Sequence, residues 1–245
     1  MSLHLHKIFV YKNNAPQNDI VINLCEKAIK SAISNDYELC VLDKNNVANY
    51  IDFELLNFDS NKINLSTFNK DYLFLCILYC NGGIIIEPDV ILTKDFSEIF
   101  NLLEPCDLVV FGESFSKISK SFFMANKKAL VLKELINNYV LNTKNTYNIC
   151  LEVEINKLNN PKIVILDSEK TGYEIEKTIF GVSGDYIYKN CYFTNGVTVD
   201  EFFESTRGIT KLKYPLTPTK YKNMKINEFL KQDILIAKIF NKLLS

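Results

Sequence analysis

The stretch "KDYLFLCILYCNGGIIIEPDVILTKDF", residues 70–96, contains the clearest structural signals of the sequence. Its first part, residues 70–80, is apolar on every side and long enough for three turns, which predicts a helix buried within the domain. The pair Asn81-Gly82 is a typical helix end, because either residue accepts the left-handed conformation found there. The three isoleucines at 84–86 then predict a short central strand in the core.

Two carboxylates, Glu87 and Asp89, stand at the end of this strand on either side of Pro88. Acidic side chains next to a buried strand are costly unless a positive charge compensates them. Carboxylate oxygens are the ligands that Mg²⁺ or Mn²⁺ takes in proteins, together with water and substrate phosphates. The sequence therefore predicts an open metal site with exposed carboxylates, and the alternative is a plain strand end whose carboxylates are solvated.

Strand and helix patterns alternate through most of the chain, which predicts an α/β fold with a largely parallel, mixed sheet flanked by helices. Ligands of such sheets bind beyond the carboxyl ends of the strands. The other predicted strands are residues 6–11, 37–43, 107–113, 121–126 and 162–167, and the other helices are residues 19–34, 129–141, 149–158 and 227–244. Residues 171–221 show no clear pattern. The sequence has neither an internal repeat nor a linker, which favours a single domain over residues 1–245.

Composition excludes some classes of function. The formal net charge is -1, from 28 basic and 29 acidic residues, so a nucleic-acid partner is not expected. The seven cysteines are an odd number, and most lie within apolar runs, which indicates buried thiols in a reducing cytoplasm. Neither a signal peptide nor an apolar run of about 18 residues is seen, so we expect a cytoplasmic protein. Peripheral association with the inner face of a membrane stays open.

Residues 70–89 resemble a motif of glycosyltransferase family 32, which has the form S-D-Y-x-R-x-x-x-L-x-x-x-G-G-x-Y-x-D-x-D. This family includes sugar transferases of bacterial capsule and lipo-oligosaccharide synthesis. The positions that match are Asp71, Tyr72, Leu78, Gly82, Gly83 and Asp89. Fainter similarity covers residues 6–11, "NDYELCVLD" at 35–43 and residues 118–139, and it fades after about residue 160.

The sequence also departs from this motif. Glu87 replaces the first aspartate of the D-x-D, Ile85 replaces its tyrosine, and Phe74 stands where an arginine helps to hold the donor nucleotide. No histidine follows His6, so a late histidine ligand for the metal is missing. Two alternatives therefore stay open beside an active enzyme: a catalytically impaired binding or assembly subunit with the same fold, and a metal-dependent nuclease.

The resemblance implies a GT-A fold and a hexosyltransferase-like enzyme that transfers sugar with retention of configuration. Its donor would be a UDP- or GDP-sugar, and its acceptor a glycan or a lipid-linked glycan of surface polysaccharide. Residues 1–125 would form the nucleotide-sugar half, and residues 126–245 the variable acceptor half. Mn²⁺ or Mg²⁺ would bind Asp89 directly, and Glu87 would contact a metal-bound water or the ribose.

Further contacts are predicted by position. Asp71 would face the donor. The alternative is that its negative charge only stabilises the helix N-terminus through the helix dipole. Gly82 and Gly83 would let the backbone pass close to the donor, and their alternative is a plain helix cap. The remaining candidates are Tyr11, Lys12 and Asn14 for the base, Glu113 as a catalytic residue near the sugar, and Lys211 and Lys213 for the diphosphate. The alternative for each is an ordinary surface or strand-end residue, and residues 210–222 would form a loop able to close over the donor.

Overall fold

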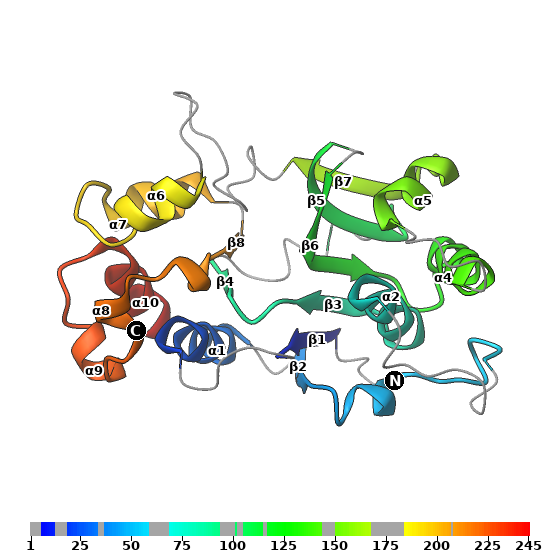
Figure 1. Ribbon diagram of the computed structural model, residues 1–245, viewed down its shortest axis with the longest axis horizontal. Helices are drawn as coiled ribbons and strands as arrows, with labels where there is room; N and C mark the ends of the chain where they lie inside the picture. Colours follow the sequence, from blue (N-terminus) through cyan, green and yellow to red (C-terminus); the bar gives the residue numbers. More distant parts are fainter. Residues whose placement is uncertain are drawn as a thin grey trace. The chain divides into compact units, whose positions relative to one another are not determined.

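The computed structural model describes residues 6–12, 19–33, 37–58, 69–93, 101, 105–114, 117–143, 150–167, 184–206 and 208–245 (Figure 1). The chain divides into two compact units. The first unit comprises Met1–Asn13, Asn35–Glu87 and Phe100–Asp167, and the second comprises Asn14–Ser34, Pro88–Ile99 and Ser168–Ser245. These boundaries differ from the predicted halves, which meet near residue 125.

A six-stranded sheet forms the centre of the first unit. In spatial order its strands are β2 (Tyr37–Leu42), β1 (His6–Tyr11), β3 (Gly83–Ile86), β6 (Lys117–Ala125), β5 (Leu108–Ser114) and β7 (Ile163–Asp167). Every neighbouring pair is parallel except the two that involve β6, which runs against both β3 and β5. The predicted α/β class and the largely parallel sheet are confirmed.

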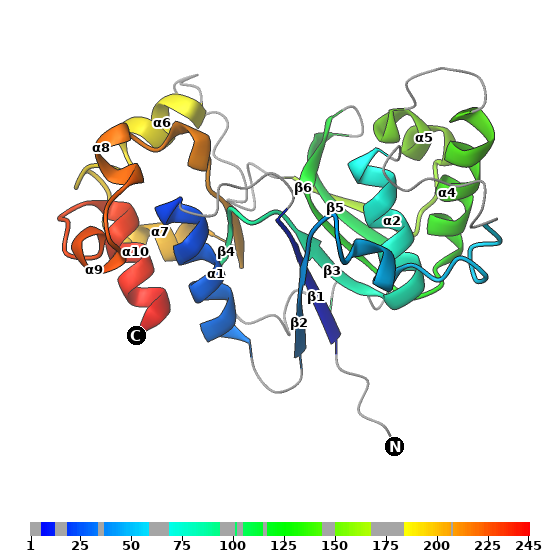
Figure 2. The ribbon, with the colours of Figure 1, turned by 60° about the horizontal axis from the view of Figure 1, so that its bottom comes forward.

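Helices cover one face of this sheet, as Figure 2 shows. They are α2 (Lys70–Asn81), α4 (Leu130–Thr143), α5 (Leu151–Leu158) and the short 3-10 helix η1 (Val47–Tyr50). Helix α2 is buried from Asp71 to Cys80, as its apolar sequence predicts. Its Phe74 is fully buried and packs edge-on against Tyr11 and Phe123. The residue that replaces the motif's arginine thus belongs to the core.

Two glycines connect α2 to β3. Gly82 and Gly83 have φ angles of 71° and 98°, in the region that favours glycine. The Gly82 amide caps α2 by donating to the Leu78 carbonyl oxygen at 2.6 Å. A Cβ atom on Gly83 would lie 2.2 Å from the Lys7 carbonyl oxygen, because β3 passes very close to β1 there. Both glycines are therefore required by the turn itself.

The second unit is mainly helical. Its helices are α1 (Ile20–Ala32), α6 (Gly184–Asn190), α7 (Val199–Ser205), α8 (Thr219–Lys222), α9 (Ile226–Phe229), α10 (Leu235–Leu244) and the 3-10 helix η4 (Tyr214–Leu216). A two-stranded antiparallel ribbon joins β4 (Val90–Leu92) to β8 (Ile209–Lys211). Asp19 caps α1 by accepting from the amides of Val21 and Ile22. An aromatic cluster that includes Phe193, stacked on Tyr221, fills the core.

Two predictions for this unit are wrong. The predicted helix at 227–244 is two helices, α9 and α10, separated by an extended Ile234. The break allows the amides of Leu235 and Ile236 to bond to carbonyl oxygens of Thr194 and Tyr192, at 2.8 and 2.9 Å. The predicted loop at 210–222 instead contains the end of β8, η4 and α8.

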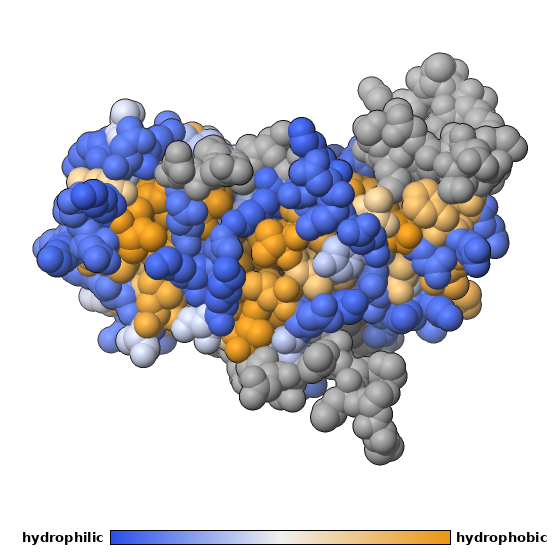
Figure 3. All heavy atoms as spheres, turned by 90° about the horizontal axis from the view of Figure 1, so that it is seen from below, coloured by the Kyte–Doolittle hydropathy of each residue, from blue (hydrophilic) through white to orange (hydrophobic). Residues whose placement is uncertain are grey.

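Hydrophilic residues cover much of the face drawn in Figure 3, with apolar residues exposed between them. Within the described ranges, none of the helices has the length and apolar character that a membrane span requires. Five of the seven cysteines are buried, as predicted, while Cys150 is exposed and Cys191 is partly exposed.

Candidate active site

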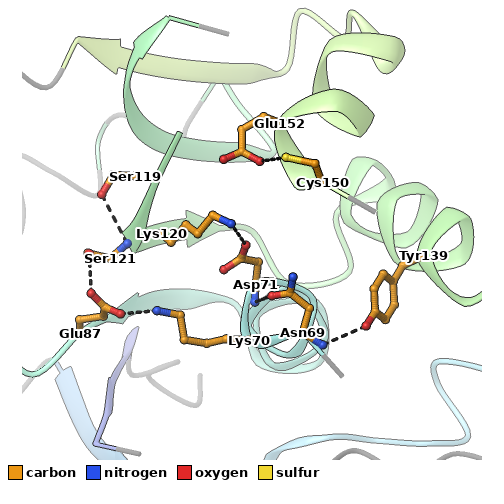
Figure 4. A network of polar contacts seen from close by, with 10 residues as sticks. All are labelled: Asn69, Lys70, Asp71, Glu87, Ser119, Lys120, Ser121, Tyr139, Cys150 and Glu152. Carbon is orange, nitrogen blue, oxygen red and sulfur yellow. Dashed lines mark hydrogen bonds and ion pairs between the residues drawn. The ribbon is translucent and has the colours of Figure 1, made fainter. Parts of the chain in front are cut away.

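The candidate site lies in the first unit, where three elements meet at the carboxyl end of β3 (Figure 4). Helix α2 runs back along the sheet before β3 begins, so its first residues lie beside the end of that strand. Strand β6 is antiparallel to β3, so its early residues lie there too, and the Glu87 amide donates to the Ser121 carbonyl oxygen at 3.0 Å. The order of elements thus brings charged side chains from all three to one edge.

Glu87 is held by two neighbours at this edge. The Lys70 ammonium group forms an ion pair with Oε1, and the Ser121 hydroxyl group donates to Oε2. The Glu87 side chain is 21% exposed. Its negative charge is therefore compensated by the protein.

Asp71 is more deeply buried, with a side chain that is 1% exposed. Its Oδ2 lies 3.1 Å from Nζ of Lys120, which is half-exposed. Within the described part of the chain, Oδ1 is buried without a partner, and Oδ2 has this ion pair but no hydrogen bond of good geometry. Burial raises the pKa of the Asp71 carboxyl group, although Lys120 acts in the opposite direction. The site thus contains a carboxylate with one oxygen left to accept a hydrogen bond.

The surroundings of Asp71 fix its backbone. Asn69 caps α2 through its side chain, which accepts from the Asp71 amide at 3.0 Å. The Asn69 amide in turn donates to the Tyr139 hydroxyl group at 2.9 Å, and Tyr139 stacks on Tyr72. The hydroxyl group of Tyr72 is buried and, among the described residues, has no hydrogen-bond partner. The Asn69 cap and its hydrogen bond to Tyr139 thus hold the start of α2 in place beside the sheet edge.

Of the predicted base contacts, Tyr11 and Lys12 lie at the end of β1, and Asn14 lies outside the described residues. Tyr11 is only 9% exposed and packs on Phe74, while the Lys12 amide donates to the Leu42 carbonyl oxygen at 2.8 Å. Glu113 belongs to β5 as predicted, but its side chain lies outside the described part. These roles stay predictions.

The predicted glycine contacts lie at the other end of β3 from Glu87. Gly82 and Gly83 begin the strand, next to Lys127 and Lys7. The close packing of their backbone supports the alternative, in which they serve the turn between α2 and β3.

Three predicted residues belong to the second unit. Asp89 precedes β4, and its carbonyl oxygen accepts from the Leu212 amide at 2.7 Å. Asp89 is 4% exposed, so the expectation of an exposed carboxylate is wrong for this residue. Lys211 ends β8, opposite Val90, whereas Lys213 lies in the short connection between β8 and η4.

The predicted metal ligands can be compared with this geometry. No group of three or more His, Cys, Asp or Glu side chains suited to a metal occurs among the residues that the structure describes. Glu87 already accepts from Lys70 and Ser121. The metal prediction therefore depends on Asp89.

Lys70, Lys120 and Ser121 also belong to the site, and none of them was among the predicted site residues. Lys70 directly precedes Asp71, and its position at the start of a buried helix was the available signal. Lys120 and Ser121 open the apolar run of β6, in "ISKSFFMA". Their place next to β3 depends on the antiparallel direction of β6, which the sequence does not display.

Comparison with solved structures identifies the class of fold. The glycosyltransferase GlyE from Streptococcus pneumoniae TIGR4 is similar over 98% of this chain, with a TM-score of 0.50 and 11% identity. The bifunctional glycosyltransferase WbbM is similar over 99% of this chain, with a TM-score of 0.51 and 9% identity. This chain spans 60% and 50% of those two proteins. The fold is thus that of GT-A-type glycosyltransferases, as predicted.

The family follows from the sequence. Residues 12–153, more than half of the chain, match the family model of the capsular polysaccharide synthesis protein. The chain therefore belongs to the capsular polysaccharide synthesis protein family. Comparison with curated protein sequences gives no significant match.

Proposed function

We propose that this protein is a glycosyltransferase that moves a sugar from a nucleotide-sugar donor to a growing capsular polysaccharide. The observation that carries the proposal is the buried Asp71 carboxylate at the carboxyl edge of a parallel-rich sheet. Ligands of α/β sheets bind at this edge. A buried carboxylate with one oxygen unoccupied is costly, and a sugar hydroxyl group is a donor that would satisfy it.

Each residue at this edge would have a distinct part. Asp71 would accept a hydrogen bond from a hydroxyl group of the donor sugar. Lys70 and Ser121 would keep Glu87 in place, which fixes the end of β3 next to the start of α2. A carboxylate accepts stronger hydrogen bonds than a neutral oxygen, so an ionised Asp71 would orient the sugar firmly.

The metal requirement is part of this proposal. Asp89 would bind Mn²⁺ or Mg²⁺, which when bound would stabilise the charge that develops on the leaving nucleoside diphosphate. Lys211 and Lys213 would add positive charge for the phosphates. Both roles come from the resemblance to glycosyltransferase family 32 and from the sequence pattern.

The substrates are proposed on the same basis. The donor would be a UDP- or GDP-sugar, and the acceptor a glycan or lipid-linked glycan of capsule or lipo-oligosaccharide. Transfer would retain the anomeric configuration, as in the family that the motif resembles. The proteins with similar solved structures are glycosyltransferases, which supports this class of reaction.

A binding screen tests the proposal. The melting temperature of the full chain would be measured with UDP-glucose, UDP-galactose, UDP-N-acetylglucosamine and GDP-mannose, each with and without Mn²⁺. A ligand at 100 times its Kd stabilises a protein by about 2.7 kcal/mol, so at least one donor should raise the melting temperature. Stabilisation by none of them would contradict the proposal.

One observation favours a second candidate, a binding subunit with the same fold and little activity. Phe74 fills the core where the motif has an arginine, and Glu87 is held by Lys70. Such a subunit would bind a nucleotide sugar without releasing nucleoside diphosphate. Product release therefore separates the two candidates.

A further inference from the structure

The pair formed by Asp71 and Lys120 is the most unusual polar feature of the first unit. Asp71 is almost completely buried, while the Lys120 side chain is 47% exposed. The ammonium group lies 3.1 Å from Oδ2 in an ion pair, while Oδ1 is buried without any partner among the described residues, and neither oxygen has a hydrogen bond of good geometry there. A buried salt bridge stabilises a fold only when further hydrogen bonds satisfy the remaining lone pairs, and this pair lacks them.

The charges around Asp71 come from three elements. Lys120 extends from β6, Lys70 lies next to Asp71 on α2, and Glu152 lies at the start of α5. The Lys70 ammonium group is engaged by Glu87. Glu152, which accepts from the Cys150 thiol, adds a negative charge that opposes ionisation of Asp71. Lys120 is thus the cation in contact with Asp71 within the described part of the site.

We propose that Lys120 is a positioning residue, which keeps Asp71 ionised and holds it by Oδ2 so that Oδ1 accepts a hydroxyl group of the bound sugar. This inference rests on the proposed function. Burial raises the pKa of Asp71, and Lys120 opposes that rise, so removal of the lysine should raise the pKa further. A protonated Asp71 would be a weaker acceptor for the sugar hydroxyl group.

The interaction explains why a lysine occupies a strand position beside apolar residues. Lys120 directly precedes Ser121, Phe122 and Phe123, which are buried in the sheet. The pKa of Lys120 is lowered by burial, but the hydrogen bond and the charge of Asp71, together with Glu152, raise it overall. The ammonium form is therefore maintained, and a permanent positive charge is what a positioning role requires.

The test has two parts on the full chain. Carboxyl-carbon NMR would follow the pKa of Asp71, assigned with Asp71→Asn, in the wild type, Lys120→Met and Lys120→Arg. Lys162→Met is the matched control, because Lys162 pairs with Asp107 at 3.7 Å at the start of β7. We expect a higher Asp71 pKa in Lys120→Met only. An unchanged pKa in that variant would overturn the inference.

Calorimetric titration of the same proteins with the four nucleotide sugars, and with UDP and GDP alone, forms the second part. Lys120→Met should weaken sugar-nucleotide binding about 10- to 100-fold at pH 7, the value of a hydrogen bond to a charged group. Binding of UDP and GDP should hardly change, and Lys120→Arg should restore most of the affinity. The loss should also shrink at higher pH, where Asp71 ionises without the lysine.

The outcomes separate this inference from the proposed function. Equal weakening of UDP and UDP-sugar binding would show a general structural effect and would overturn the positioning role. Absence of binding by all nucleotide sugars to the wild type would overturn both the proposed function and the sugar contact. The NMR result would still decide whether Lys120 controls the charge of Asp71.

Discussion

A buried carboxylate is costly unless its oxygens have partners, and Asp71 has only one of its two in an ion pair. Glu87, at the same edge, has partners for both oxygens. The two carboxylates therefore differ in how far the protein itself satisfies them. Glu87 fits a structural role at the end of β3, whereas Asp71 fits contact with a ligand.

Replacement of Asp71 by Asn should stabilise the protein and weaken sugar binding. The raised pKa means that the folded state disfavours the ionised form relative to the unfolded chain, whose pKa is near 3.8. This destabilising contribution is fully present above the folded pKa and disappears as pH falls below 3.8. We expect Asp71→Asn to gain about 1 kcal/mol at pH 7 in urea unfolding, at the low end of the cost of an unsatisfied buried group.

The matched control is Asp107→Asn, which removes the carboxylate of the pair with Lys162. This variant should show neither the gain in stability nor the loss of sugar binding. The opposite result would be a loss of stability in Asp71→Asn, relative to the wild type, that is larger at pH 7 than at pH 4. It would show that ionised Asp71 stabilises the protein as an ion-pair partner, and it would contradict the prediction.

Asp89 is the residue on which the metal proposal depends. Because Asn has nearly the same shape and the Asp89 carbonyl contact with Leu212 is retained, Asp89→Asn should keep the fold. Mn²⁺-dependent donor binding should weaken by about tenfold or more, in line with the loss of a ligand or its support. Titration with and without Mn²⁺ checks this, with Asp200→Asn, which removes an exposed partner of Lys242, as control. Unchanged Mn²⁺ dependence would remove Asp89 from the metal site.

The segment from α2 to β3 was predictable because its signals are local. An apolar run, a glycine pair and three β-branched residues follow one another without interruption. The break between α9 and α10 was not predictable, since it depends on bonds from Leu235 and Ile236 to residues far away in the sequence. The position of Lys120 beside Asp71 likewise depends on strand direction.

Gly83→Ala tests the packing of the turn between α2 and β3. A positive φ and a Cβ position 2.2 Å from the Lys7 carbonyl oxygen leave no room for a side chain. We expect a loss of about 3 kcal/mol or more in unfolding free energy. Gly196→Ala is the control, because the nearest atom to its Cβ would be 3.8 Å away, and it should stay within about 0.5 kcal/mol. Equal stability of both variants would contradict the described approach of β3 to β1.

The fold and the family of the chain agree with the class of protein that the sequence indicated. The GT-A-type fold follows from the sheet and its similarity to solved structures, and the family follows from residues 12–153. The identity of the charged residues at the sheet edge was only partly foreseen. Asp71 was among the predicted contacts, whereas its partner Lys120 became visible only through the fold.

Release of nucleoside diphosphate would show whether Asp71 takes part in sugar transfer by this protein. The nucleotide sugar that stabilises the wild-type chain most would be incubated with Mn²⁺ and with wild type, Asp71→Asn or Asp107→Asn, and free UDP or GDP would be measured over time. We expect release by the wild type and Asp107→Asn, and a rate about 10- to 100-fold lower for Asp71→Asn, since a hydrogen bond to a charged group is lost. Equal release by Asp71→Asn and wild type, or binding without release by the wild type, would contradict this expectation.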